Sequence, residues 1–290
     1  MPDIPSELDS LVAGAPSGRR GFIVTSLGAG FALAAQPIMA QQLITTNSAG
    51  LIAGEVRIPV ADGTIPAYRA APAGKKHAPV VIVISEIWGV HEHIADVTRR
   101  LAKLGYFAVA PELFARQGDP RKIEGIPQLL RDIVAKVPDQ QVFGDLDATV
   151  AWAASEQADT RRLGVIGFCW GGRQVWMYCT RNPKVKAGVA WYGRLRDNVS
   201  ANQPRHPLDW ADSLTVPVLG LYGGKDQGIP QTDVEEMNKR LKAAGQPSYI
   251  RVYPDAGHAF NADYRPSYRK AEAEDAWQQM LEWLRRYGVK

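Results

Sequence analysis

The sequence contains little of what defines several whole classes of protein. Among its 290 residues there are only two cysteines, Cys169 and Cys179, which excludes a disulfide framework and a cysteine-rich zinc site. Lysines and arginines are interspersed with acidic residues rather than gathered in runs, so the net charge of +4 does not indicate a nucleic-acid partner. No apolar stretch reaches the roughly 20 residues that a membrane-spanning helix needs. The mature protein is therefore expected to have no stable membrane insertion.

What is present is an ordinary composition for a globular protein. Hydrophobic residues make up 46% of the chain and charged residues 22%, which provides enough apolar side chains for a sizeable core and excludes a largely disordered chain. The length would allow two domains, but single α/β domains commonly reach about 250 residues. Because the chain shows no repeat and no low-complexity segment, we expect one domain.

The N-terminal segment has the pattern of an export signal. An uncharged stretch follows two adjacent arginines, Arg19 and Arg20, and its first part, 21–35, is apolar and too short to span a membrane. This arrangement resembles a twin-arginine signal peptide. We expect residues 1–40 to be the signal and 41–290 to be the mature domain, which would be periplasmic or secreted. If the signal is not functional, the protein would stay in the cytoplasm.

Buried strands and amphipathic helices alternate along the rest of the chain. The continuous β-branched run at 80–84 is typical of a strand buried on both faces. Further strands are expected at 106–110, 163–168, 186–191, 217–222 and 249–253, and helices at 93–104, 145–156, 171–179 and 267–287. The proline-interrupted segment 117–143 should form a helical excursion, either a cap over a site or a surface feature. Such alternation predicts an α/β fold with a mostly parallel sheet covered by helices on both faces.

A strand-to-helix turn carries the first chemical signal. Gly-Phe-Cys-Trp-Gly-Gly at 167–172 follows a buried strand and precedes a helix, which is the nucleophile-elbow pattern with Cys169 in the nucleophile position. The small flanking residues suit a tight turn with strained backbone angles. At a helix N-terminus the dipole favours the thiolate form of a cysteine. Taken alone, the motif is also compatible with a cysteine that only packs in a turn.

Two further residues follow in the order that a hydrolase elbow requires. Asp226 lies after the strand expected at 217–222, and His258 lies after the strand expected at 249–253. The order nucleophile, acid, histidine is typical of α/β-hydrolases, in which the acid holds the imidazole in one tautomer and the imidazole transfers the proton. Separately, Asp226 could be a turn residue and His258 a surface histidine. Together with Cys169 they favour a catalytic triad.

At these motifs the sequence resembles the dienelactone hydrolase family, whose elbow carries a cysteine. The resemblance covers about residues 50–287 and includes the elbow, Ser-Glu-Ile-Trp-Gly at 85–89, Pro-Glu-Leu-Phe-Ala-Arg at 111–116 and Gly-His-Ala-Phe at 257–260. It implies a single domain with the α/β-hydrolase fold. It implies no cofactor.

The resemblance also implies a role for particular residues. Cys169, His258 and Asp226 would form the triad, and Glu86 would hydrogen-bond the thiol and help to deprotonate it. The backbone N–H groups of Ile87 and Trp170 would form an oxyanion hole, where two convergent amides stabilise the developing negative charge. Glu86 alone could be a surface carboxylate, but the apolar run before it places it at the carboxyl end of a strand, where ligands bind in open α/β sheets.

The anion site departs from the family pattern. The family's namesake binds a substrate carboxylate with two arginines, one of them four residues after the catalytic histidine, where this sequence has Ala262. Arg265 lies nearby and could substitute for it. Arg121 and Arg131, within the segment 117–143, are candidates for the second arginine. The resemblance therefore supports a hydrolase more strongly than it supports a dienelactone as the substrate.

Two other groups of residues have weaker interpretations. Trp88, Trp191 and Tyr192 stand at expected strand ends and could line an aromatic pocket or simply pack in the core. His-Glu-His at 91–93 could suggest metal ligands. Residues two apart in a helix do not share a face, however, and no further ligand set is visible, so no metal site is expected.

The function predicted from these observations is hydrolysis of a lactone or small carboxylic ester through a cysteine nucleophile and a thioester acyl-enzyme. Three alternatives stay open: a broader esterase without dienelactone specificity, a non-catalytic binding protein on the same fold, and an acyltransferase whose acceptor outcompetes water. A small-molecule lactone or ester is the one partner that the sequence indicates.

Overall fold

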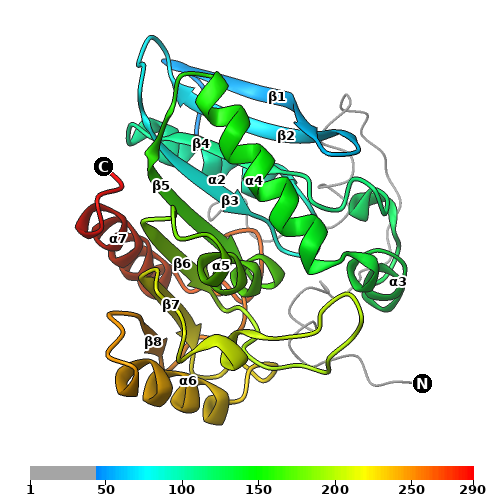
Figure 1. The fold of residues 1–290 in the computed structure, drawn as a ribbon, viewed down its shortest axis with the longest axis vertical. Helices are drawn as coiled ribbons and strands as arrows, with labels where there is room; N and C mark the ends of the chain where they lie inside the picture. Colours follow the sequence, from blue (N-terminus) through cyan, green and yellow to red (C-terminus); the bar gives the residue numbers. More distant parts are fainter. Residues whose placement is uncertain (1–43) are drawn as a thin grey trace.

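Eight strands form one sheet at the centre of the structure, a computed structural model that describes residues 44–290. In chain order they are β1 (Leu51–Val60), β2 (Gly63–Pro72), β3 (Pro79–Ile84), β4 (Phe107–Pro111), β5 (Asp159–Phe168), β6 (Ala187–Trp191), β7 (Val218–Gly223) and β8 (Tyr249–Tyr253). The order across the sheet is β1-β2-β4-β3-β5-β6-β7-β8 (Figure 1). Strands β3 to β8 run parallel to one another, and β2 pairs antiparallel with both β1 and β4. The predicted α/β class with a mostly parallel sheet is confirmed.

The central strands form where the sequence has continuous apolar runs. All six residues of β3 are buried, because helices cover the sheet on both sides of this strand. The sequence pattern does not predict the hairpin β1–β2, since these strands contain glycine, proline and alanine and many of their residues are exposed or half-buried. Val60 pairs with Gly63, so two residues form the turn between the two strands.

Helices cover both faces of the sheet. They are α2 (Glu92–Lys103), α3 (Ile126–Asp132), α4 (Asp139–Ser155), α5 (Trp170–Arg181), α6 (Gln231–Ala243) and α7 (Lys270–Arg286), with short 3₁₀ helices η2 (Pro120–Lys122), η3 (Val134–Lys136) and η4 (Pro207–Trp210). In Figure 1, α4 and α5 lie on one face of the sheet and α2 lies on the other. The excursion expected at 117–143 is made of η2, α3, η3 and the start of α4. The sequence pattern does not predict α6, because most of this helix is polar and only four of its residues are buried.

The carboxyl ends of the parallel strands bring the candidate site residues to one edge of the sheet. Cys169 directly follows β5, Asp226 follows β7 and His258 follows β8. Glu86 lies just after β3. Since these four strands are parallel, residues that are far apart in the sequence meet at the edge where α/β proteins bind ligands.

The predicted export signal at 1–40 lies outside the described residues, so it stays a prediction. Within residues 44–290, no helix is long and apolar enough to cross a membrane. The chain from Ile44 onward is attached to α2. The backbone N–H of Thr46 donates to Asp96 at 2.5 Å, and the Arg99 side chain donates to the Thr46 carbonyl oxygen at 2.8 Å.

A buried ion pair joins the beginnings of α4 and α5. Arg173 donates two parallel hydrogen bonds to the Asp139 carboxylate, at 2.7 and 2.9 Å, and a third to the Arg205 carbonyl oxygen at 2.8 Å. Gln174 also donates to Asp139. Both charged side chains are buried, so each depends on the other to offset the loss of hydration.

We predict that Asp139→Asn strongly destabilises the fold, because it leaves the Arg173 guanidinium buried beside a neutral amide. Breaking a buried pair in this way costs about 3–5 kcal/mol in the free energy of unfolding. Urea denaturation followed by circular dichroism measures it. Asp132→Asn is the matched control, since it breaks an exposed aspartate–arginine pair with Arg131 and should leave the denaturation midpoint nearly unchanged. Equal midpoints for the two variants would contradict the role given to the buried pair.

Candidate active site

Cys169 occupies a strained turn between β5 and α5. Its φ of 54° and ψ of −114° form a backbone conformation that residues other than glycine rarely adopt. Two glycines allow the chain to pass close to the neighbouring strands here. A Cβ on Gly171 would lie 2.3 Å from the Ile84 carbonyl oxygen, and a Cβ on Gly172 would lie 2.4 Å from that of Trp191. The turn therefore needs both glycines, and it holds the cysteine at the N-terminus of α5.

Asp226 and His258 form a buried pair at the same edge of the sheet. Nδ1 of His258 lies 2.7 Å from one oxygen of Asp226, and the backbone N–H of Gly228 donates to the other oxygen at 3.0 Å. This contact fixes the orientation of the ring and leaves Nε2 for a reacting group. Nε2 is buried and has no hydrogen-bond partner within residues 44–290. His258 and Cys169 line the same cavity.

The surroundings of His258 favour its protonated form. Burial alone would lower the pKa of the imidazole, but the charges of the Cys169 sulfur and the Asp226 carboxylate, and the hydrogen bond to Asp226, raise it to about 10. The imidazolium that these partners favour is the form that can donate a proton from Nε2. This arrangement suits a cysteine nucleophile, since the thiolate is the reactive form.

The cavity next to Cys169 has a volume of about 270 Å³. It is lined by Ile87, Leu130, Val134, Ala135, Cys169, Trp170, Arg173, Tyr192, Arg194, Asp197, Gln203 and His258. The two residues expected to supply oxyanion-hole amides, Ile87 and Trp170, are thus beside the nucleophile. Leu130, Val134 and Ala135 belong to α3 and η3, so the excursion at 117–143 forms a wall of the site and not only a surface feature.

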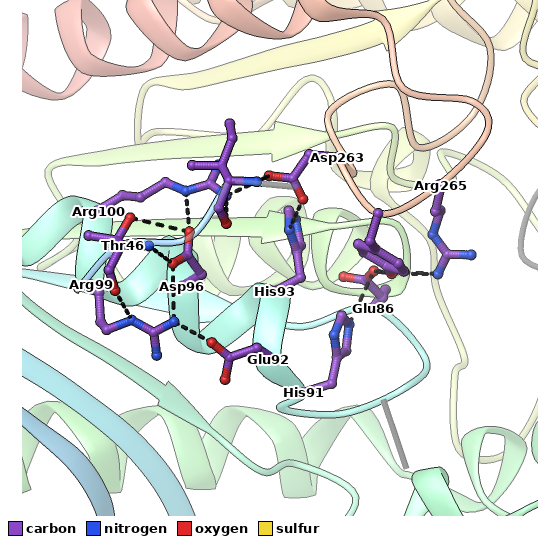
Figure 2. Close-up of polar contacts among 12 residues, drawn as sticks. Thr46, Glu86, His91, Glu92, His93, Asp96, Arg99, Arg100, Asp263 and Arg265 are labelled. Carbon is purple, nitrogen blue, oxygen red and sulfur yellow. Dashed lines mark hydrogen bonds and ion pairs between the residues drawn. The ribbon is translucent and has the colours of Figure 1, made fainter. Parts of the chain in front are cut away.

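Glu86 lies in a separate buried cluster, which Figure 2 shows beside His91 and Arg265. The Tyr264 hydroxyl donates a hydrogen bond to Oε1 of Glu86. The same oxygen lies 3.4 Å from Nε2 of His91 and 3.6 Å from the Arg265 guanidinium, which also donates to the Tyr264 hydroxyl at 2.6 Å. The Glu86 carboxylate therefore interacts with Tyr264, His91 and Arg265.

The cluster keeps the Glu86 carboxylate ionised. Burial alone would raise its pKa, but His91 and Arg265 lower it to well below the usual range. Burial also lowers the pKa of His91, which favours the neutral form of this imidazole. The Arg265 guanidinium keeps its charge and therefore stabilises the Glu86 carboxylate whether or not His91 is protonated. Within the described part of the chain, Glu86 makes no hydrogen bond to Cys169. The role expected for Glu86, hydrogen bonding to the thiol, stays a prediction.

The loop that carries Tyr264 and Arg265 is fixed by a larger ionic network, drawn in Figure 2. Asp263 is buried, and one of its oxygens lies 3.0 Å from Nδ1 of His93 while the other accepts a hydrogen bond from Arg100 at 2.6 Å. Asp96, on the same helix, accepts from Arg100 at 2.5 Å. Through α2, the segment that follows Ile44 is thus connected to the loop whose Tyr264 contacts Glu86.

The structure separates the residues expected to form an aromatic and cationic pocket. Tyr192 lines the cavity, and its ring meets that of His258 edge-on at 5.1 Å. Trp191 instead lies fully buried against Phe168 and Phe260 and is not among the cavity-lining residues. Tyr192 follows the end of β6 with a φ of 38°, so the regular alternation of a strand does not apply to it. Trp88 is half-buried against the core and is not among the cavity-lining residues.

The candidate arginines also lie apart from the cavity wall. Arg265 is buried next to Glu86. Burial alone would lower the pKa of its guanidinium, but the charges of Tyr264 and Glu86 raise it. Arg131 is exposed and pairs with Asp132. Arg121 pairs with Asp119 and lines a different cavity. The arginine on the rim of the catalytic cavity is Arg194, which the sequence patterns do not single out.

The two histidines at 91 and 93 lie closer together than helical spacing suggests. Their rings are stacked with centroids 6.1 Å apart, and both pack against Tyr264. His91 is the N-cap of α2 with extended backbone angles, so the expectation that the two side chains point apart is wrong. Over residues 44–290 there is no group of three or more histidine, cysteine, aspartate or glutamate side chains placed to hold a metal ion.

The sequence patterns also miss Tyr264, which is the hydrogen-bond donor to Glu86. It follows His258 by six positions, in the loop that departs from the family pattern. That departure is the one signal in the sequence that pointed to this loop.

Comparisons with known proteins agree with this geometry. The family described as "Dienelactone hydrolase family" matches residues 65–288. A protein of Methylorubrum extorquens named "Putative carboxymethylenebutenolidase" is 57% identical over 290 residues, which covers all of both chains. A protein of Escherichia coli strain K12 with the same name is 52% identical over 269 residues, covering 92% of this chain and 99% of the other.

A solved structure matches as well. The crystal structure titled as a "Putative Dienelactone Hydrolase" from Klebsiella pneumoniae is 53% identical and has a TM-score of 0.80, covering 82% of this chain and 99% of its own. The resemblance predicted from the motifs is thus confirmed by both sequence and structure. The chain belongs to the dienelactone hydrolase family and is a hydrolase of that type with the α/β-hydrolase fold.

Proposed function

We propose that the protein hydrolyses a lactone or small carboxylic ester through Cys169 as the nucleophile. The observation that carries this proposal is the strained elbow, which places Cys169 at a helix N-terminus in a cavity shared with His258. A non-catalytic packing role would not need a positive φ at a residue other than glycine, because such strain persists only where the surrounding structure imposes it.

The first half of the reaction forms a thioester. The Cys169 thiolate attacks the carbonyl carbon of the substrate, and the negative charge moves to the carbonyl oxygen. Backbone N–H groups of Ile87 and Trp170 would stabilise that oxyanion. The His258 imidazolium then gives its Nε2 proton to the leaving alkoxide as the C–O bond breaks. For a lactone, the leaving alcohol remains attached to the acyl group.

The second half needs His258 to act as a base, and the electrostatics of the site provide for this. The charge of the Cys169 sulfur is one of the causes that raise the pKa of His258. Thioester formation neutralises the sulfur, so the pKa of the imidazole falls at the step where it must accept a proton from water. Hydroxide attack on the thioester then releases the acid and restores the thiolate–imidazolium pair.

A second candidate, an esterase that prefers neutral substrates, is favoured by one observation. Both arginines that line the cavity already face carboxylates: Arg173 pairs with Asp139, and Arg194 pairs with Asp197 at the rim. A substrate carboxylate would compete with these partners. The choice between a carboxylate-bearing lactone and a neutral ester is therefore a matter for a direct comparison of substrates.

Replacement of Cys169 tests the nucleophile. We predict that Cys169→Ala lowers kcat at least about 10³-fold on any ester that the wild type hydrolyses, because the covalent route is lost. Cys179→Ala is the matched control: this thiol is buried in α5, where burial raises its pKa, and its loss should leave kcat unchanged. Circular dichroism confirms that both variants fold. Retained turnover in a folded Cys169→Ala variant would disprove the mechanism.

Substrate charge distinguishes the two candidate activities. We predict that kcat/KM for a carboxylate-bearing dienelactone exceeds that for p-nitrophenyl acetate, and that added salt lowers only the rate with the lactone, because salt screens the attraction between an anion and the arginines. Steady-state kinetics at low and high ionic strength provide the measurement. A higher kcat/KM for the neutral ester, with no salt dependence for either substrate, would identify the protein as a broader esterase.

A further inference from the structure

The motif Pro-Glu-Leu-Phe at 111–114 has no part in the proposed chemistry, yet the structure brings its glutamate to the active-site turn. Glu112 directly follows β4 and is buried. The backbone N–H of Val90 donates to its Oε2 at 2.8 Å. The other carboxyl oxygen, Oε1, is buried and makes no hydrogen bond within the described residues.

Gly89 shows how closely this carboxyl group contacts the turn. Its φ is +70°, and a Cβ built on it would lie 2.5 to 2.9 Å from the two oxygens and the carboxyl carbon of Glu112. Glycine is therefore required here for two reasons, the left-handed backbone and the close approach of the carboxyl group.

The turn that Glu112 contacts carries groups that the reaction uses. The Gly89 N–H donates to the Glu86 carbonyl oxygen at 3.2 Å, and the His91 N–H donates to the Gly89 carbonyl oxygen at 3.0 Å, so the segment 86–91 is one short hydrogen-bonded unit. Ile87 within it lines the catalytic cavity. A shift of the turn would move the Ile87 amide relative to the carbonyl oxygen of the substrate.

We propose that Glu112 is a positioning residue for the reaction: its carboxylate holds the turn 86–91 and thereby the Ile87 amide, and protonation of Glu112 weakens this hold. The inference rests on the proposed function, because it assigns Ile87 to the oxyanion hole. Hydrogen bonds to an ionised acceptor are shorter and roughly twice as strong as those to a neutral one, which is the physical reason for the difference between the two forms.

Glu112 is placed to change its charge in the neutral range. Burial raises the pKa of Glu112 to about 7, and the charge of Asp119 also raises it. The N–H groups of Val90 and Phe114 and the charge of Arg121 lower this pKa, but by less. A cavity of about 110 Å³ adjoins it, with room for several water molecules that can exchange the proton. The titratable or charged groups that face Glu112 across this cavity are Glu55 of β1, Tyr68 of β2, His91 of the turn, Glu92 of α2 and Arg121 of η2.

The raised pKa of Glu112 makes the stability of the fold depend on pH, whether or not the enzyme is active. The ordinary pKa of a glutamate is 4.5, so folding favours the protonated form of Glu112. The contribution of Glu112 to stability is therefore favourable at low pH and is lost as the pH rises from about 4.5 through about 7. Glu112→Gln removes this dependence, because an amide does not titrate.

Three variants test the inference: Glu112→Gln, Glu112→Ala and Gly89→Ala. The matched control is Glu55→Gln. The pH dependence of kcat/KM is measured for each, together with the backbone amide resonances of Val90 and Ile87 in ¹⁵N NMR spectra and the midpoint of thermal unfolding between pH 4.5 and 8. Glu55 lines the same cavity but is exposed, whereas the contacts with Gly89 and the Val90 N–H are made by Glu112.

In the wild type we expect kcat/KM to rise about threefold to tenfold through pH 7, and the Val90 and Ile87 resonances to shift with the same midpoint. Glu112→Gln should abolish both changes, and Glu55→Gln should abolish neither. Glu112→Ala and Gly89→Ala should lower kcat by about tenfold, less than the roughly 100-fold loss that follows removal of an oxyanion-hole donor. Relative to Glu112→Gln, the wild type should lose thermal stability over the same pH range.

The inference would be overturned by a Val90 resonance that does not shift through neutral pH, or by a Glu112→Gln variant with the wild-type pH profile. Turnover that still depends on Cys169 would leave the proposed function intact in either case. If the wild type hydrolysed neither ester nor lactone, the proposed function would fail instead. The two resonances and the unfolding midpoints would then still decide whether Glu112 holds the turn.

Discussion

The strained backbone at Cys169 is the constraint on which the rest of the site depends. The elbow keeps its positive φ only because Gly171 and Gly172 let α5 begin in contact with the ends of β3 and β6. The energy cost of such a conformation, about 1–3 kcal/mol, is offset by the burial of the central strands on both sides. As a result, the proposed nucleophile lies at a helix N-terminus. Packing of the protein determines this position, so substrate binding does not have to create it.

Two buried electrostatic clusters lie at the same edge of the sheet as Cys169 and have opposite characters. For the pair of Asp226 and His258, burial lowers the pKa of the imidazole, whereas the charges of Cys169 and Asp226 raise it. In the proposed mechanism this ring serves as an acid in one step and a base in the next. The cluster of Glu86, Arg265 and Tyr264 is compensated internally and connected through Asp263 to α2. In the proposed mechanism the first cluster changes its charge during the reaction, whereas the second keeps the Glu86 carboxylate ionised.

The sequence predicts local features of this protein well and long-range contacts poorly. The central strands could be predicted because continuous β-branched runs are buried on both faces, and the elbow because its glycines and cysteine are contiguous. The hairpin β1–β2 could not, since edge strands lack such runs. Tyr264 meets Glu86 across 178 positions of sequence, a contact without a local pattern. Trp191 and Tyr192 are adjacent, and Tyr192 reaches the cavity from a positive φ just beyond β6, a backbone conformation that the hydrophobic pattern does not predict.

The central claim, a covalent intermediate on Cys169, is tested most directly by intact-protein mass spectrometry. The wild type is mixed with p-nitrophenyl acetate and quenched in acid within the first turnovers, conditions under which a thioester survives. The account predicts a mass increase equal to one acetyl group, located by peptide mapping on the peptide that contains Cys169 and absent from Cys169→Ala. Turnover without an adduct, or an adduct on another residue, would contradict it.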